Sequence, residues 1–336
     1  MLWRTRRLRD LGGDKALDSS IAAARPASEC SQVRVICPID HGALVVTEKG
    51  LRCTECSTAF PVIRGVPVLL NETNSVFRLA DYTGDAAYEG ASGYGGAADT
   101  TSGWRKAYRR FACRLTEAPI PGWHFDPRLM ILSERPEAEV LVIGSGERQW
   151  IGGRITYTDV AFARDVHCIC DAHDLPFPDA SFDAVLAEAV LEHVCDPQRC
   201  VEEIRRVLKP GGLVWAVTPF LQPVHMGAHD FTRFTPLGHR RLFRWFDELA
   251  SGMQGGPIYS GIHLLKSLFL ALSDRPRPRA ALHLVALLLT YPMRHLDRFL
   301  GRTRGATNAA CACYFLGRKR ESAIPDRVII NMFRGM

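Results

Sequence analysis

The sequence lacks an uninterrupted apolar run long enough to cross a membrane. A spanning helix needs roughly 18 or more consecutive apolar residues, and the longest approach, AALHLVALLLTYPM, is broken by His283 and Pro292. The first ten residues, MLWRTRRLRD, also lack the apolar core of a secretory signal. We therefore expect a cytoplasmic chain whose 11 cysteines are reduced.

A strong charge imbalance is also lacking. The formal net charge is only +6 over 336 residues, which gives no strong signal for nucleic-acid binding. Apolar residues make up 47% of the chain. This content can bury a full core, so one large domain and one small domain are expected.

Composition divides the chain into five parts. Short apolar runs between turn signals in the second part predict a few short strands. Residues 71–103 are rich in Gly, Ala, Asp and Thr, which indicates a linker or lid, and a helix is expected from Trp104 to about Leu115. The expected parts are a flexible tail (1–30), a small β domain (31–72), a linker and helical lid (73–135), a large domain (136–320) and a C-terminal tail (321–336).

From Val140 onward, apolar runs of strand length alternate with helical segments. This alternation is typical of an α/β fold with a parallel sheet and crossover helices. Val201, Ile204 and Val207 recur at helical spacing, and the following Lys-Pro-Gly predicts the helix end. The predicted strands are EVLVIG, RITYTDV, VHCICDA, FDAVLAEA, GLVWAVTP, ELASGMQ and a closing antiparallel ACACYFLG.

A Gly-x-Gly turn follows the first of these strands. Gly144 and Gly146 let the backbone turn sharply and approach a ligand, because glycine has no Cβ. Asp159 ends the next strand, where its carboxylate can accept both hydroxyl protons of a ribose. The alternative interpretations are a chance pair of glycines and a solvated loop acid.

Four segments then carry a resemblance to a known family. They are DAHDLPF, SFDAVLAEAVLEHV, EEIRRVLKPGG and PFLQPVHMGAHDFTRFT. The stretch from Val140 to Thr235 resembles the class I methyltransferases, specifically the type 11 subgroup. The resemblance implies a doubly wound, Rossmann-like seven-stranded sheet and an S-adenosylmethionine-dependent methyltransferase.

The same resemblance implies a cofactor site. The glycine turn would pass under the methionine and ribose portion of S-adenosylmethionine, and Asp159 would hold the ribose hydroxyls. Asp171 and the Ala172 backbone would hold the adenine, while Glu188 would face the cofactor near its cationic sulfonium. The implied cofactor residues are Gly144, Ser145, Gly146, Asp159, Asp171, Ala172 and Glu188.

The glycine motif departs from the family pattern at two positions. Val142 stands where the family has an acidic residue, and Arg148 stands where it has a further glycine. These departures support an alternative hypothesis, in which the chain is a catalytically degenerate methyltransferase fold that acts as a partner-binding or regulatory module.

A histidine-rich loop follows the strand GLVWAVTP. His225, His229, Asp230 and Arg233 are the candidates for substrate orientation or general-base catalysis, because an imidazole with a pKa near 6.5 can take a hydroxyl proton. In the alternative interpretation, Asp230 and Arg233 pair only to fix the loop. His193 is expected to be a structural hydrogen-bonding residue.

The small N-terminal domain contains a candidate metal site. Cys37 and Asp40 form one pair and Cys53 and Cys56 another. This segment resembles the small zinc-ribbon proteins that accompany methyltransferases, which implies a tetrahedral zinc site and a protein partner. Asp40 or His41 would replace the missing thiolate, or the metal is lost. Cys30 is the least favoured candidate ligand.

Two apolar helical stretches at about 259–302 form the last feature of interest. Seven arginines flank them, namely Arg275, Arg277, Arg279, Arg294, Arg298, Arg302 and Arg304. A lid packed on its own domain is the favoured interpretation, and peripheral contact with an anionic membrane is the alternative. By resemblance, the methyl acceptor is expected to be a small molecule, a saccharide or a lipid-linked intermediate.

Overall fold

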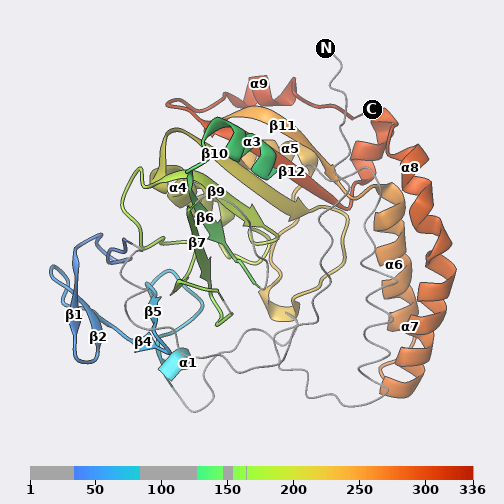
Figure 1. Ribbon diagram of the computed structural model, residues 1–336. Helices are drawn as coiled ribbons and strands as arrows, with labels where there is room; N and C mark the ends of the chain where they lie inside the picture. The colour runs from blue at the N-terminus through green and yellow to red at the C-terminus, as the bar shows by residue number, and fades with distance from the viewer. Residues whose placement is uncertain (1–33, 84–126, 147–153, 164, 336) are drawn as a thin grey trace.

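A nine-stranded sheet forms the centre of the protein (Figure 1). The computed structural model describes residues 34–83, 127–146, 154–163 and 165–335. The strand order is β11-β12-β10-β9-β6-β7-β8-β5-β4. The strands are β4 Val62–Ile63, β5 Val66–Leu69, β6 Glu139–Ile143, β7 Arg154–Asp159, β8 Cys168–Cys170, β9 Phe182–Glu188, β10 Leu208–Pro219, β11 Phe246–Gln254 and β12 Ala312–Lys319.

The seven strands from β6 to β12 confirm the predicted doubly wound sheet. Strands β8, β7, β6, β9 and β10 are neighbours in parallel, and β12 lies between β10 and β11 and is antiparallel to both. The chain reverses its direction of travel across the sheet between β6 and β9. Ligands of open α/β sheets bind at such a switch point, beyond the carboxyl ends of the strands.

The start of β10 differs from the prediction. Helix α4 (Pro197–Val207) ends directly before β10, so Lys209, Pro210 and Gly211 belong to the strand and not to a loop. Leu208 pairs with Phe182, and the register shifts before Leu213. Gly211 has a φ of +70° inside this irregular stretch, a conformation that glycine adopts at little cost.

The N-terminal segment contributes to two sheets. Strands β1 (Leu44–Thr47), β2 (Gly50–Cys53) and β3 (Ala59–Phe60) form a small antiparallel sheet. Strand β5, however, adds in parallel to β8, with Val68 opposite Ile169. The apolar run of β5 is buried, as is usual for a strand of a parallel sheet. Its pairing with β8 provides hydrogen-bond partners for its backbone. The segment 31–72, which we expected to form a separate small domain, therefore contributes two strands, β4 and β5, to the main sheet.

Both faces of the sheet are buried, because successive side chains of a strand point to opposite sides. Leu141, Ile143 and Val185 pack on one face with the apolar side of α4. Val140, Val142 and Trp215 pack on the other face with Ile131 of α3. Asp196 directly precedes helix α4 and caps it, because its carboxylate accepts from the Arg199 N–H at 3.1 Å.

Helices complete the fold, and two of them form a long hairpin at one side (Figure 1). The hairpin buries Ile262 and Leu287 but leaves Leu264, Leu268 and Leu272 more than half exposed. Among the described helices, none has the length and hydropathy to cross a membrane. The helices are α1 Ala80–Thr83, α3 Pro127–Glu134, α4, α5 Pro236–Leu242, α6 Pro257–Ala271, α7 Pro276–Thr290, α8 Asp297–Leu300 and α9 Asp326–Ile330, the last within the expected C-terminal tail. The helix expected at 104–115 lies outside the described residues.

Candidate functional site

The glycine turn after β6 has the backbone shape that the sequence suggested. Gly144 and Gly146 have φ values of +63° and +53°, which L-residues with side chains rarely adopt. A Cβ on Gly144 would lie 2.4 Å from Cγ2 of Val190, in the turn after β9. A Cβ on Gly146 would meet no described atom within 4 Å. Gly144 is therefore fixed by packing across the switch point, whereas no described atom packs against the Gly146 position.

Asp159 and Ser145 stand beside this turn. The Gly146 N–H donates to Oδ2 of Asp159 at 2.9 Å, and the Ala161 N–H donates to Oδ1 at 3.0 Å. Burial raises the pKa of Asp159, although these backbone hydrogen bonds oppose the shift. Ser145 is only 4% exposed, and its Oγ has no hydrogen-bond partner among the described residues. The turn therefore presents an unused hydroxyl and a carboxylate with spare lone pairs.

Asp171 lies just beyond β8 and is held from two directions. His173 donates to its Oδ1 from the backbone at 3.1 Å and is bonded to it through Nδ1 at 2.6 Å, and Ser75 donates to its Oδ2 at 2.6 Å. Burial favours a raised pKa for Asp171, but the hydrogen bonds and charge of His173 outweigh it and lower the pKa. Ala172 is also buried. Much of the acceptor capacity of Asp171 is thus used within the chain.

Glu188 is the last residue of β9 and lies, like Asp159 of β7, at the carboxyl end of its parallel strand. Its Oε1 accepts a 2.7 Å hydrogen bond from Nε1 of Trp215 on β10. The next residue, Ala189, has a φ of +56°, which is unusual for a residue with a Cβ. The chain therefore turns sharply after Glu188, directly before the Val190 side chain that packs on Gly144.

The histidine-rich loop after β10 is fixed by an ion pair. Arg233 forms a two-pronged hydrogen-bonded pair with Asp230, and it also donates to the Gln222 carbonyl at 2.9 Å. The pKa of Asp230 is lowered to about 2; burial works against this shift, and the bonds from Arg233 outweigh it. Asp230 also accepts from the His225 N–H at 2.9 Å. The two side chains therefore pair with each other within the loop, and Asp230 also holds the backbone of His225.

His229, the other predicted histidine of this loop, makes different contacts. The His229 ring stacks on Phe77 with centroids 5.7 Å apart. Its carbonyl oxygen accepts a 2.7 Å hydrogen bond from Nδ1 of His193. Because Phe77 follows the Ser75 that holds Asp171, the segment leading to α1 reaches from the loop after β8 to the loop after β10.

Two residues that sequence reasoning did not select complete this edge. Glu192 is fully buried, and neither carboxylate oxygen has a hydrogen-bond partner among the described residues. Burial raises its pKa to about 7. Nε2 of His193 lies 3.2 Å from Nε2 of His225 and 3.7 Å from Oε1 of Glu192. The sequence signal was an adjacent acid and histidine inside the apolar run VLEHV, directly after a strand.

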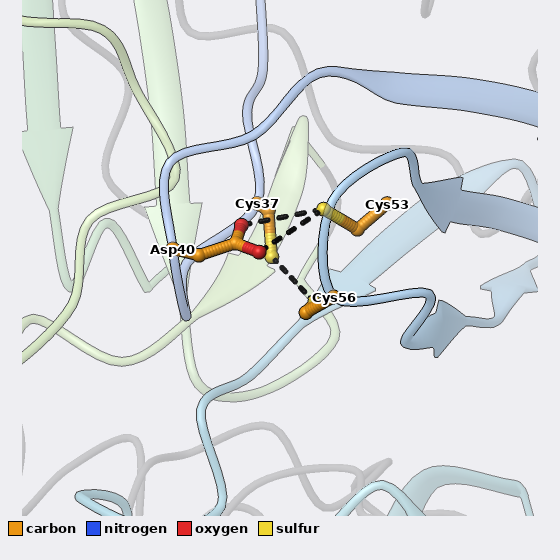
Figure 2. A group of neighbouring side chains, drawn as sticks. All are labelled: Cys37, Asp40, Cys53 and Cys56. Carbon is orange, nitrogen blue, oxygen red and sulfur yellow. Dashed lines mark hydrogen bonds between the residues drawn. The ribbon is translucent and has the colours of Figure 1, made fainter.

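The N-terminal domain brings the four predicted metal ligands together (Figure 2). Sγ of Cys37 lies 3.7 Å from Sγ of Cys56, and Sγ of Cys53 lies 3.3 Å from Oδ1 of Asp40. One ligand atom from each residue lies within 4.8 Å of the others. His41, the alternative ligand, is exposed and not part of this group, and Cys30 lies outside the described residues.

The surroundings of this cluster are built closely around the sulfur atoms. The Ile39 and Glu55 N–H groups each donate to a cysteine sulfur at 3.4 Å. A Cβ on Gly42 would lie 2.8 Å from Sγ of Cys53 and 3.0 Å from Oδ1 of Asp40. Three thiolates and a carboxylate oxygen are a donor set that suits zinc, so the residues present fit the implied metal.

Comparison with known proteins finds a match over part of this region. Residues 154–216 match the methyltransferase domain family. They contain β7, β8, β9, α4 and most of β10, and hence Asp159, Asp171 and Glu188. The match covers only this part of the chain, and it does not identify a methyl acceptor.

Individual relatives match over short stretches. The ubiquinone/menaquinone biosynthesis C-methyltransferase UbiE of Ralstonia nicotianae is 37% identical over 79 residues, which are 24% of this chain and 32% of that protein. The demethylmenaquinone methyltransferase of Clavibacter sepedonicus is 52% identical over 44 residues, 13% of this chain and 18% of that protein. The chain thus spans about a third or less of the length of these curated relatives.

A solved structure is similar over a larger part of the chain. Phosphoethanolamine N-methyltransferase 2 of Haemonchus contortus, in complex with S-adenosyl-L-methionine, has a TM-score of 0.39 and 18% identity. The alignment covers 66% of this chain and 59% of that chain.

Proposed function

We propose that the chain is an S-adenosylmethionine-dependent methyltransferase. The observation that carries the proposal is the hydrogen bond from the Gly146 N–H to Asp159 at the switch point of the sheet. It joins the glycine turn to the acid that follows it in the next strand. Ligands of open α/β sheets bind at this position, and the domain match covers the Asp159 side of it.

The residues around the turn fit the cofactor in three respects. Gly146 has no described atom packed where a Cβ would lie, Ser145 has a buried hydroxyl to donate, and Asp159 keeps lone pairs for ribose hydroxyls. Glu188 places a carboxylate at the same edge, where it favours a cationic sulfonium. Asp171 and Ala172 would line the adenine end. When bound, S-adenosylmethionine supplies a methyl group on an excellent leaving group.

The chain's own contribution is chiefly positioning. Holding a nucleophile, a methyl group and a sulfur atom in line supplies a large part of the acceleration of such a transfer. The loop of His225, His229, Asp230 and Arg233 would orient the acceptor on the opposite side of the cofactor. The Asp230–Arg233 pair makes this loop rigid, which suits a positioning role.

The acceptor class that we propose is a small molecule, a saccharide or a lipid-linked intermediate. The α6–α7 hairpin supports the lipid-linked case. It exposes Leu264, Leu268 and Leu272, and Arg275 and Arg277 stand at its turn. An apolar surface with a basic margin favours contact with anionic lipid.

For the N-terminal domain we propose a structural zinc ion held by Cys37, Asp40, Cys53 and Cys56. The domain has few buried apolar residues of its own, and Cys37 and Cys53 already pack against the main core. A metal at this position would fix the loop before β1 to the turn after β2. The exposed side of the small sheet would then be available to a protein partner.

Calorimetry with S-adenosylhomocysteine tests the proposed activity at its cofactor step. We expect binding by the full chain and at least tenfold weaker binding by Asp159→Asn, which removes the charge but keeps the side-chain shape. Asp247→Asn on β11 is the matched control, because it removes an exposed carboxylate paired with Arg320. No heat for the full chain at millimolar ligand would contradict the proposal and favour the partner-binding alternative.

A further inference from the structure

Three ligand atoms converge where the segments that follow β9 and β10 meet. Oε1 of Glu192 lies 3.7 Å from Nε2 of His193 and 3.9 Å from Nε2 of His225, and the two nitrogens are 3.2 Å apart. The point equidistant from these atoms lies about 2.1 Å from each, which is the length of a zinc–nitrogen or zinc–oxygen bond. The three groups are therefore spaced as ligands of one ion.

The backbone orients one imidazole for this role. Nδ1 of His193 is 2.7 Å from the His229 carbonyl oxygen, so Nδ1 carries the proton and Nε2 presents its lone pair. A carbonyl or carboxylate that accepts from the other ring nitrogen is the usual support of a metal-binding histidine. His193 thus has the tautomer that ligation requires.

The second imidazole has a similar support. Nδ1 of His225 lies 3.4 Å from Oδ2 of Asp230 and 3.3 Å from the guanidinium of Arg233. If Arg233 donates to Nδ1, the two imidazoles share a hydrogen bond. That tautomer still leaves Glu192 with no donor among the described side chains. If Nδ1 donates to Asp230 instead, both Nε2 atoms and the buried carboxylate face one point with lone pairs only.

A buried carboxylate without a donor is costly. Glu192 is 0% exposed, and a cation between the three groups would satisfy its carboxylate. Two imidazoles and a carboxylate suit divalent transition metals such as zinc, manganese, iron or cobalt. We propose that Glu192, His193 and His225 form a divalent transition-metal site.

The site would keep open coordination positions. Three protein ligands do not fill the shell of such an ion, and the His225 side chain is 31% exposed. The cluster also begins two residues after Val190, which packs on Gly144. Resting on the proposed function, we infer that oxygen atoms of the methyl acceptor would enter these positions, so the acceptor would be a metal-chelating hydroxyl or carbonyl compound.

Cobalt(II) titration of the metal-free full chain tests the site directly. The cysteine cluster would give a thiolate-to-cobalt charge-transfer band, which a site of nitrogen and oxygen ligands lacks. We expect two cobalt ions per chain, of which only one contributes to that band. Glu192→Gln and His225→Asn should each bind one cobalt ion fewer and retain the full band. His295→Asn is the matched control, because this exposed histidine lies in the helical region outside the cluster.

Two further measurements make the outcome decisive. Circular dichroism checks that each variant is folded, and S-adenosylhomocysteine binding is measured on the same samples. Equal cobalt binding by wild type, Glu192→Gln and His225→Asn would overturn the metal site, whether or not the cofactor binds. Absence of S-adenosylhomocysteine binding by the wild-type chain, together with two bound cobalt ions, would instead contradict the proposed function and leave the metal site standing.

Discussion

The hydroxyl of Ser75 donates a 2.6 Å hydrogen bond to the carboxylate of Asp171. This bond ties the segment that follows β5 to the loop that follows β8, at the edge where the candidate cofactor residues lie. Asn74 adds a second tie, because its side-chain amide donates to Asp174 at 2.9 Å. The N-terminal part of the chain is therefore built into the candidate site.

Ser75→Ala should destabilise the protein by about 2 kcal/mol, because it removes a hydrogen bond to a buried charged group. Urea unfolding measures the change. Ser133→Ala is the control, since Ser133 is exposed and bonds only to the Met130 carbonyl within α3. Equal midpoints for the two variants would show that the tie to Asp171 contributes nothing.

Gly144→Ala should cost about 2–4 kcal/mol, more than Gly146→Ala at about 1 kcal/mol. Both positions have positive φ, but among the described residues only a Cβ on Gly144 overlaps another side chain, that of Val190. Val190→Ala in the Gly144→Ala background should recover part of the loss. A double-mutant cycle by thermal unfolding measures this coupling, and strictly additive effects would refute the contact.

Arg240→Met should cost about 1.5–3 kcal/mol, because it removes a buried charged hydrogen bond to Glu248, while Ser251 and Arg334 still contact that carboxylate. Arg240 and Glu248 are each 6% exposed in their side chains and are 2.7 Å apart. Burial favours a raised pKa for Glu248, but Arg240 and Ser251 outweigh it and lower the pKa. Arg241→Met breaks only the exposed pair with Asp326 and should cost less than about 1 kcal/mol. Chemical denaturation that ranks the two variants in the opposite order would contradict this assignment.

His239 should make the protein less stable in acid. Its pKa is lowered to about 3 by complete burial, so below about pH 6.5 the unfolded chain binds a proton that the folded chain does not. Stability should therefore fall by about 1.4 kcal/mol per pH unit as the pH drops from 6.5 toward 5. His239→Leu should lack this part of the slope, whereas the exposed His295→Leu should retain it. Denaturation curves at several pH values give the slopes, and parallel slopes for wild type and His239→Leu would count against the assignment.

Cys53→Ser should remove one zinc ion per chain and loosen the N-terminal domain. Cys53 contributes a buried sulfur to the cluster, whereas Cys195 is an exposed thiol outside it. Cys195→Ser is therefore the matched control. Native mass spectrometry counts the metal, and proteolysis within residues 34–60 reports the loosening. Unchanged zinc content in Cys53→Ser would exclude the proposed zinc site of the N-terminal domain.

The sequence was sufficient for the seven-stranded sheet, because each strand is an apolar run bounded by turn residues, as in EVLVIG before Gly144. The partner of β5 was not predictable in the same way. Its pairing with β8 joins Val68 to Ile169, and no local pattern specifies such a distant neighbour. The early start of β10 was missed because Lys-Pro-Gly-Gly is a turn signal in isolation, and the pairing of Leu208 with Phe182 overrides it.

The candidate site was predicted in part for a related reason. The Asp230–Arg233 pair follows from residues three apart in one loop. The grouping of Glu192, His193 and His225 depends on where the turns after β9 and β10 meet, which only the assembled sheet determines. His229 was selected for its imidazole, whereas its carbonyl oxygen is the atom that orients His193.

The parallel pairing of β5 with β8 has a consequence for the order of events during synthesis. Strand β5 leaves the ribosome roughly a hundred residues before the strand on which it docks, and such distant pairing is slow to form. The cysteine cluster of the N-terminal domain and the strands β1, β2 and β3 would therefore be synthesised well before β8, the strand with which β5 pairs. If this cluster binds its metal early, the N-terminal domain is already folded when β8 is synthesised. Strand β5 would then be in place for β8 to pair with it as the first half of the large domain folds.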